Sequence, residues 1–352
     1  VSGLDSMILN EAPDYSGETV SETASFWVGL EAWHGYVSYE KHGDGDWTGY
    51  NNCWQKIDKY YIPQKASANM AVYDVDKPAD YIPNANLPSL YPGMSQINAP
   101  VGVDPLWNDL QTTYGSPNRM YQMHWILDVE GYYGFHNRGG GTKNVFINTY
   151  QRGLQESSFE TVTQGTWNDW KNGGGPYGFE PLFTKGKQVY PEAPFDYGQK
   201  WSYTSAPDAE IRAIQWAFWA QKFATEQGKQ AQIATSHAMA RKMGDYGRYM
   251  LFDKYFRIIG DNQKGTKWTD NNSYASCHFL VNWYVSWGGE IVPADDPAGA
   301  DRDPYYNFLV SCSECHQGYQ GVIAAYALAT GGGGMAPLSP GAGDVWKGSL
   351  YR

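Results

Sequence analysis

Seven segments of this sequence place apolar side chains at helical spacing, and long stretches rich in glycine and proline separate them. The predicted helices span residues 20–38, 50–61, 105–114, 208–227, 229–257, 273–287 and 318–329. Shorter segments at 124–128 and 145–147 are predicted to be extended. Strands and helices do not alternate along the chain, which argues against a parallel α/β fold. The pattern therefore predicts an all-α bundle or toroid.

Composition narrows the classes of partner. The chain has 352 residues, enough for one large domain or two ordinary ones, and its formal net charge is −11. An acidic chain disfavours nucleic acid and anionic membrane as partners, and the sequence has no run of about 18 apolar residues to span a membrane. Aromatic residues make up 16% of the chain. Aromatic rings fill cores, but they also stack on the apolar faces of sugar rings.

An acidic residue, Glu22, opens the first predicted helix. The apolar side chains of that helix recur at helical spacing: Phe26, Leu30, Trp33 and Val37. Glu22 lies four residues before Phe26 and is expected on the same apolar face. A carboxyl group on apolar surface holds its proton more readily, and such a group can protonate a glycosidic oxygen. The alternative is structural: Ser21 caps the helix and Glu22 occupies its positive first turn.

Two further acidic residues, Asp208 and Glu210, follow Pro207 at the start of the helix predicted at 208–227. One interpretation is that Asp208 caps the helix and Glu210 is a first-turn acid. The other is that helix-terminal N–H groups hold Asp208 ionised, as a general base that activates water requires. With Glu22, it would supply two carboxyl groups in different environments, the arrangement used for glycoside hydrolysis.

Two further patterns concern metals and cofactors. Cys312, Cys315 and His316 fit the C-x-x-C-H pattern of covalent haem attachment, but nothing else in the sequence supports haem and none is expected. One Cys-x-x-Cys without a second pair is weak evidence for zinc. Gln155 and Glu160 can offer oxygen ligands to calcium, and the alternative is an ordinary polar surface.

Several segments, in this order, resemble glycoside hydrolase family 48, the processive reducing-end cellulases. The matching segments of the first half are Glu11–Tyr15, Ser21-Glu22, Gly45–Trp47, Pro78–Tyr81, Met123–Trp125, Leu127-Asp128, Ile147–Thr149, Gln151–Gly153, Gln155–Ser157 and Glu160-Thr161. Those of the second half are Trp201, Tyr203-Thr204, Ala206–Ala209, Arg212–Gln215, Lys242–Tyr246, Phe252–Phe256, Ser286–Gly289, His316 and Gly318–Gln320. The resemblance runs from Glu11 to about Lys347, nearly the whole chain.

This resemblance implies an (α/α)6 toroid whose long loops form a substrate tunnel and cleft, and inverting hydrolysis of β-1,4-glucan with cellobiose as the main product. It implies Glu22 as the general acid and Asp208 as the general base, with Glu11 in the same site as a rival for positioning the water. The two carboxyl groups of an inverting enzyme should stand about 6.5–9.5 Å apart. The resemblance also assigns Gln155 and Glu160 as ligands of a structural Ca²⁺. The aromatic residues expected along the sugar path are Trp287, Tyr319, Tyr203 and Trp125.

The family's catalytic domains are longer than this chain. We therefore interpret residues 1–352 as a single catalytic domain that is partial relative to the family, with a toroid incomplete at its C-terminus. The expected partner is a cellulose or cello-oligosaccharide chain outside the cell, and an additional C-terminal segment or a larger cellulase complex is expected to complete the protein. Two other functions stay open: a chitinase of the same family, and a polysaccharide-binding protein without catalysis.

Overall fold

The computed structural model describes residues 18–65, 105–115, 119–128, 146, 166, 200–249, 251–252, 280–281, 284–290, 308–311 and 321–339. These residues are mostly helical with few strands, which confirms the prediction of a mainly α-helical fold. Four predicted site residues, Glu11, Gln155, Glu160 and Tyr319, lie outside the described residues, as does the Cys312–His316 pattern.

The helical elements, in chain order, are α1 (Ser21–His42), α2 (Thr48–Lys56), the π-helical turn η1 (Ile57–Tyr61), α4 (Pro105–Tyr114), α8 (Pro207–Glu226), η5 (Gln230–Ile233), α9 (Ala234–Tyr249), α11 (Val322–Thr330) and η8 (Gly332–Gly334). The strands are β1 (Glu18–Val20), β2 (Ile126–Asp128), β3 (Lys200–Ser205), β4 (Leu251–Phe252), β5 (Leu280–Val281), β6 (Val285–Glu290) and β7 (Phe308–Ser311). Among the helices described, none combines the length and the apolar character needed to cross a bilayer.

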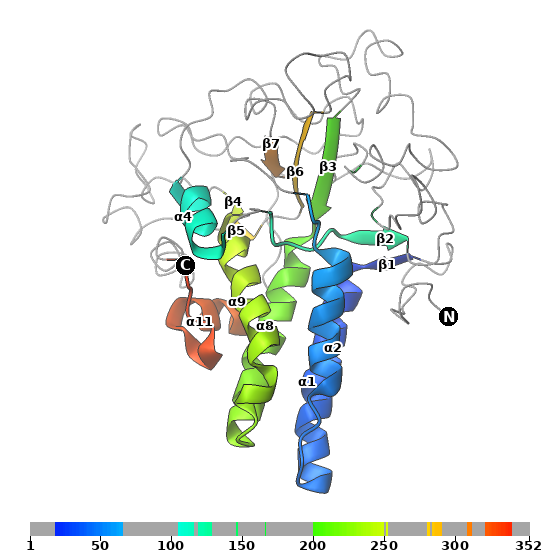
Figure 1. Cartoon of the computed structure of the whole chain (residues 1–352), viewed down its shortest axis with the longest axis vertical. Coiled ribbons are helices and arrows are strands. Elements are labelled where there is room, and N and C mark those ends of the chain that lie inside the picture. Colours follow the sequence, from blue (N-terminus) through cyan, green and yellow to red (C-terminus); the bar gives the residue numbers. More distant parts are fainter. Residues whose placement is uncertain are drawn as a thin grey trace.

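Four helices lie side by side and form the main core (Figure 1). α1 packs against α2 and α8, and α9 packs against the same two helices, so the four make a closed ring of contacts. α11 and η8 also pack against α8. α8 is therefore the central helix of the described structure, and all five of its alanines are buried.

α1 and α8 run parallel, because the same neighbours hold corresponding ends of the two helices. At the starts of the helices, the N–H of Ser21 donates to the carbonyl of Trp125 (2.8 Å), and the N–H of Trp125 donates to the carbonyl of Thr204 (2.8 Å), just before α8 begins. At the other end, Gln227 ends α8 and donates from Nε2 to the carbonyl of Gly35 in α1 (3.1 Å). Both helices therefore present their positive N-terminal ends at the same place.

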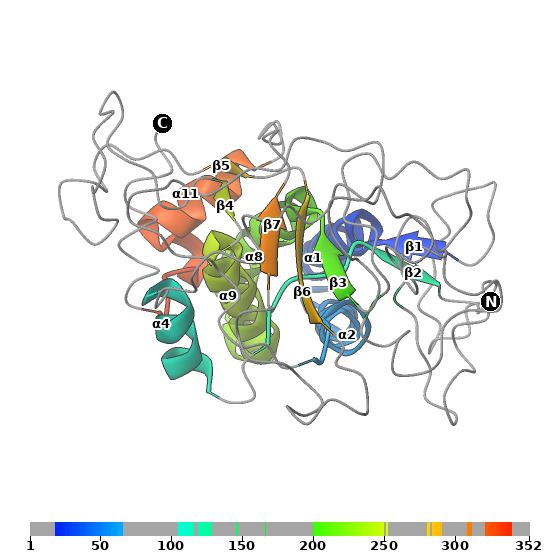
Figure 2. The same cartoon turned by 90° about the horizontal axis from the view of Figure 1, so that it is seen from above.

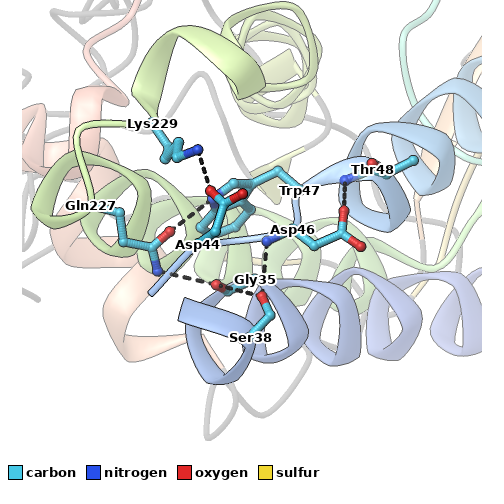
Figure 3. Close-up of polar contacts among 8 residues, drawn as sticks. All are labelled: Gly35, Ser38, Asp44, Asp46, Trp47, Thr48, Gln227 and Lys229. Carbon is cyan, nitrogen blue, oxygen red and sulfur yellow. Dashed lines mark hydrogen bonds and ion pairs between the residues drawn. The ribbon is translucent and has the colours of Figure 1, made fainter. Parts of the chain in front are cut away.

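The loop between α1 and α2 fastens the far end of this helix pair (Figure 3). The side chain of Trp47 donates from Nε1 to Oε1 of Gln227 (3.0 Å), and Lys229 forms an ion pair with Asp44. The loop is also bonded to α1, where Oγ of Ser38 accepts from the N–H of Asp46 (2.9 Å). α1 ends in a left-handed residue at position 43, a conformation that glycine adopts without strain. The loop thus fixes the C-terminal end of α8 relative to α1.

The face that α1 turns toward its neighbours consists of small residues. A Cβ atom at Gly29 would stand 2.5 Å from the indole of Trp216, and one at Gly35 would stand 2.8 Å from the indole of Trp47. The buried residues of α1 are Ser21, Ala24, Ser25, Val28, Gly29, Ala32 and Gly35. The apolar face predicted from sequence is instead exposed: Phe26, Leu30, Trp33 and Val37 are 39–67% exposed. α1 thus buries its small-residue face, because large rings from α8 and the α1–α2 loop fill the space that its glycines leave.

A three-stranded antiparallel sheet in the order β3-β6-β7 lies across the starts of the helices (Figure 2). Tyr203 of β3 pairs with Trp287 of β6, and Ser205 pairs with Val285. The helix predicted over 273–287 is therefore wrong, because residues 280–281 and 285–287 are strands. Val285, Ser286 and Trp287 are all buried in the middle strand. A short run that is buried on both faces has no strand periodicity, so its apolar residues match a helical pattern equally well.

The other predicted helices occur with adjusted ends. α4 spans the predicted 105–114, and α8 lies within one residue of the prediction. The helix predicted over 229–257 stops at Tyr249, and Leu251–Phe252 pair with Leu280–Val281 as strands. The extended segments predicted at 124–128 and 145–147 contain β2 and an isolated bridge between Leu127 and Phe146.

Candidate active site

The two predicted catalytic carboxyl groups occupy the first turns of the two parallel helices. Glu22 is in the first turn of α1, and Asp208 is in the first turn of α8. The N-cap residues are Val20 and Ala206, and neither makes a side-chain capping bond. Ser21 and Asp208 are therefore not the N-cap residues, whereas the predicted first-turn positions of Glu22 and Glu210 are confirmed. The N–H groups and dipoles of both helices favour negative charge at this end of the molecule.

One segment, residues 123–125, lies directly before β2 and joins the starts of both helices. Its last residue, Trp125, accepts from Ser21 and donates to Thr204, as described above. The N–H of His124 donates to the carbonyl of Tyr61 (2.8 Å), and Nδ1 of His124 accepts from the N–H of Thr204 (3.0 Å). Three of these bonds are between main-chain groups and the fourth is to the His124 ring, so together they set how far the start of α1 stands from the end of β3.

A second link runs through side chains. Arg212 donates from one guanidinium nitrogen to Oδ2 of Asp208 (3.1 Å) and from the other to Oγ of Ser25 (2.8 Å). Ser25 donates in turn to the carbonyl of Glu22 (2.6 Å). Asp208 and Arg212 are both buried, so each supplies the other's counter-ion inside the protein. The guanidinium also lies over the ring of Phe26, 4.3 Å from its centre.

A third carboxyl group, Glu210, lies two residues after Asp208 and is 1% exposed. Its Oε1 accepts from the N–H of Met123 (2.7 Å), the first residue of the joining segment. Burial is the main reason that the pKa of Glu210 rises to about 8; the Met123 N–H opposes the rise, and the Asp208 carboxylate adds to it. At neutral pH, Glu210 is therefore mostly a neutral acid beside the Asp208–Arg212 ion pair.

The predicted sugar-binding aromatics separate into two groups. Tyr203 and Trp287 are each 1% exposed, and Tyr203 packs against Trp287, Trp201, His124 and Phe146. A stacking platform needs an exposed ring face, so the structure gives Tyr203 and Trp287 a packing role beneath the site rather than the predicted contact with substrate. Trp125 is only half-buried, and its ring meets the edge of Tyr284 (5.6 Å between ring centres). Trp125 thus stays a candidate platform.

Nothing in the described residues tests the predicted calcium ligands, since Gln155 and Glu160 both lie outside them. Within the described part of the chain, no group of three or more His, Cys, Asp or Glu side chains could hold a metal ion. Cys53 is buried and carries a free thiol. The described part of the site is therefore built from carboxyl groups, one guanidinium and aromatic rings.

Sequence reasoning missed the roles of Arg212 and Ser25 in the site. The spacing of Asp208 and Arg212, four residues apart on one helix, is the signal that could have indicated the ion pair. Ser25 carries no comparable signal, because its partner Arg212 is 187 residues away in the sequence.

A mainly helical fold that sets two carboxyl groups on adjacent helix starts defines a candidate acid–base glycosidase. Comparison with known proteins gives the family: residues 4–352 match glycosyl hydrolase family 48, and the chain belongs to this family.

Three curated relatives show how much of a family protein this chain represents. Endoglucanase F of Ruminiclostridium cellulolyticum is 42% identical over 98% of this chain and 44% of its own length. Exoglucanase B of Cellulomonas fimi is 40% identical over 98% of this chain and 30% of its own length. Cellulose 1,4-beta-cellobiosidase (reducing end) CelS of Acetivibrio thermocellus is 40% identical over 98% and 42%. The chain thus spans less than half the length of each of these relatives.

Proposed function

We propose that this chain carries the acid–base machinery of a processive cellulase that hydrolyses β-1,4-glucosidic bonds with inversion and releases mainly cellobiose. The observation that carries the proposal is the placement of Glu22 and Asp208 on the first turns of two parallel helices joined by residues 123–125. Relatives named endoglucanase, exoglucanase and cellobiosidase support cellulose as the substrate.

Glu22 is the proposed general acid, which protonates the leaving oxygen of the glycosidic bond. Asp208 is the proposed general base; Arg212 and the start of α8 balance its negative charge and fix its orientation. Between the two carboxyl groups, an inverting mechanism needs a separation of about 6.5–9.5 Å that admits one water molecule. Glu11 is the proposed rival for positioning that water. Trp125 and Tyr319 are the proposed sugar contacts.

The deciding experiment measures soluble sugar released from amorphous cellulose by the parent and by Glu22→Gln. We expect cellobiose from the parent, a loss of about 10²-fold or more in the variant, and unchanged binding to cellulose. Glu226→Gln is the matched control, because Glu226 is an exposed residue at the end of α8. This variant should hydrolyse cellulose at the rate of the parent. Full turnover by Glu22→Gln would remove Glu22 as the acid.

If the parent releases no sugar from cellulose, two further results would identify another function. Release of chito-oligosaccharides from chitin would identify a chitinase instead. Binding to cellulose without hydrolysis, even when the rest of a family 48 domain is supplied, would identify a polysaccharide-binding protein.

We infer that the complete fold is an (α/α)6 toroid, in which further helices cover the exposed apolar face of α1. The support is the exposure of Phe26, Leu30, Trp33 and Val37, together with the greater length of the relatives. Those helices come from an additional segment or from a partner in a larger cellulase complex. Mixing the chain with the part of a family 48 domain that lies beyond its match should give a 1:1 complex by size-exclusion chromatography. Two separate peaks would contradict this inference.

We also propose a structural Ca²⁺ held by Gln155 and Glu160, and secretion of the protein. The calcium proposal is supported by the family resemblance and by the oxygen ligands that Ca²⁺ prefers. Secretion is supported by the substrate, because a cellulose fibre is too large to enter a cell. Removal of calcium by a chelator should lower the midpoint of thermal unfolding, and replacing Glu160 by Gln should remove that sensitivity.

A further inference from the structure

Glu210 is a buried carboxyl group that the proposed acid–base pair does not use. It lies on α8 two positions after Asp208, so its side chain leaves the helix on a different face from that of Asp208. Its Oε1 accepts the N–H of Met123 at 2.7 Å, across 87 residues of sequence. This hydrogen bond connects the first residue of the joining segment to α8.

The joining segment transmits this contact to the other catalytic helix. Met123 is held by Glu210, His124 by Tyr61 and Thr204, and Trp125 by Thr204. The carbonyl of Trp125 then accepts the N–H of Ser21, the residue directly before Glu22. A continuous path of hydrogen bonds and main chain thus runs from α8 to the start of α1, separate from the path through Arg212 and Ser25.

We propose that Glu210 is a positioning residue, which fixes the spacing between Glu22 and Asp208 by holding residues 123–125 against the first turn of α8. The inference rests on the proposed function for the identity of the two carboxyl groups. It assigns Glu210 no proton transfer and no contact with the substrate. Its role is to keep two groups from different helices in one reactive arrangement, where small displacements are costly.

A carboxyl oxygen suits this role because it accepts a main-chain N–H that is otherwise buried. Met123 and Glu210 are both nearly inaccessible, so a lost acceptor would leave the Met123 N–H without a partner in the core. The neutral form of the acid also avoids a second negative charge next to Asp208. A glutamine preserves the acceptor and the shape, whereas a methionine preserves only the approximate volume.

The test compares Glu210→Gln and Glu210→Met with the parent in the same cellulose assay. In Glu210→Met, we expect kcat to fall about 10- to 100-fold with KM nearly unchanged, because substrate contacts stay intact while the two carboxyl groups shift. Glu210→Gln should retain kcat within about twofold. Glu226→Met is the matched control, with the same substitution at an exposed position of the same helix.

Hydrogen exchange of the main-chain amides supplies a readout that does not depend on turnover. Faster exchange at residues 119–128 and at the start of α1 is expected in Glu210→Met, and parent-like exchange in Glu210→Gln. An active parent whose kcat survives Glu210→Met would overturn the inference, as would unchanged exchange in that variant. Equal loss of kcat in both variants would also overturn it, by indicating a proton-transfer role. An inactive parent with altered exchange would count against the proposed function alone.

Discussion

The buried ion pair between Asp208 and Arg212 is the residue-scale contact on which the site depends most. Arg212→Met would leave the Asp208 carboxylate buried without its counter-ion. We expect this to lower the free energy of unfolding by about 3–5 kcal/mol, as measured by urea denaturation. Arg119→Met is the matched comparison: Arg119 pairs with Asp58 at 3.3 Å, but the Asp58 side chain is 33% exposed. That change should cost about 1 kcal/mol or less.

A double substitution separates charge from packing. Asp208→Asn combined with Arg212→Met removes both charges, so it should be more stable than Arg212→Met alone. A double variant that is no more stable than Arg212→Met alone would contradict the ion-pair explanation. It would show that Arg212 stabilises the protein mainly through its contacts with Phe26 and Ser25.

Glu210 predicts a pH dependence of stability with a definite sign. Its pKa is about 8 in the folded protein, against an ordinary value of 4.5. Between these values the folded protein holds a proton that the unfolded chain has released, so the contribution of Glu210 is complete below pH 4.5 and is lost as the pH rises to about 8. The slope is about −1.4 kcal/mol per pH unit. Urea titrations of the parent and Glu210→Gln at pH 5–8 should differ by this slope, and parallel curves would contradict the prediction.

The contact between α1 and α8 is the element-scale feature that most restricts substitution. Gly29→Ala would place a methyl group 2.5 Å from the rigid indole of Trp216, so α1 must move away from α8. We expect a loss of about 1–3 kcal/mol in the free energy of unfolding. Gly247→Ala in α9 is the control, because a Cβ atom there would stand 4.0 Å from its nearest neighbour, the side chain of Gln122, an ordinary contact distance. That change should be neutral or stabilising by up to about 1 kcal/mol.

The stability of Gly29→Ala relative to Gly247→Ala distinguishes a steric clash between α1 and α8 from a general effect of helix propensity. Similar effects of both substitutions would show that helix propensity matters more than the close approach of α1 and α8. Combining Gly29→Ala with Trp216→Phe, which removes part of the indole, should recover some of the lost stability. If Trp216→Phe recovers none of the lost stability, the steric clash caused by Gly29→Ala is with atoms other than the Trp216 indole.

The element scale also shows what could be predicted from sequence. The start of α8 was predictable because Pro207 and two acids mark a helix N-terminus, a signal contained in adjacent residues. The buried face of α1 was not, since periodicity locates Phe26 and Leu30 on one stripe but not the neighbour that packs opposite. The strand at 285–290 was missed for the reason already given: burial on both faces removes the alternation that marks a strand.

The same limit applies to the site. Glu22 and Asp208 could be selected as candidates because each stands near a predicted helix start, and the family resemblance supplied their proposed roles. The packing of Tyr203 against Trp287 depends on the pairing of β3 with β6, more than 80 residues apart, and no local pattern shows that this pairing buries both rings. Residues 123–125 appeared in the sequence as a segment of the family resemblance, and 124–128 as an extended stretch. The connection of residues 123–125 to both helix starts is a property of the tertiary fold.

At the scale of the whole molecule, a band of aromatic rings crosses α1, α8 and α11. Neighbouring ring centres stand 5.3–6.1 Å apart along this aromatic band, which runs through Trp33, Phe223, Trp219, Phe218 and Tyr326. Its two ends are exposed, with Trp33 at 46% and Tyr326 at 49%. Leu30 at 67% and Val37 at 39% extend it along α1. The middle of the band is buried at Phe223, so the contiguous exposed apolar surface is the part on α1, and a patch of this kind marks a place where another surface binds.

This surface predicts that the chain on its own associates with itself. Leu30→Lys places a charge in the exposed part of the band on α1, so we expect weaker self-association without a loss of thermal stability, since Leu30 buries little. Sedimentation velocity at several protein concentrations measures the effect. His42→Lys is the control, because His42 is exposed in the last turn of the same helix, about three turns from Leu30, and the substitution adds the same charge away from the band. Equal effects of the two variants would attribute the change to net charge rather than to the apolar face.

A parent that stays monomeric at every concentration would mean that this face needs a specific complement. The chain should then bind the remaining part of a family 48 domain, and Leu30→Lys should weaken that binding.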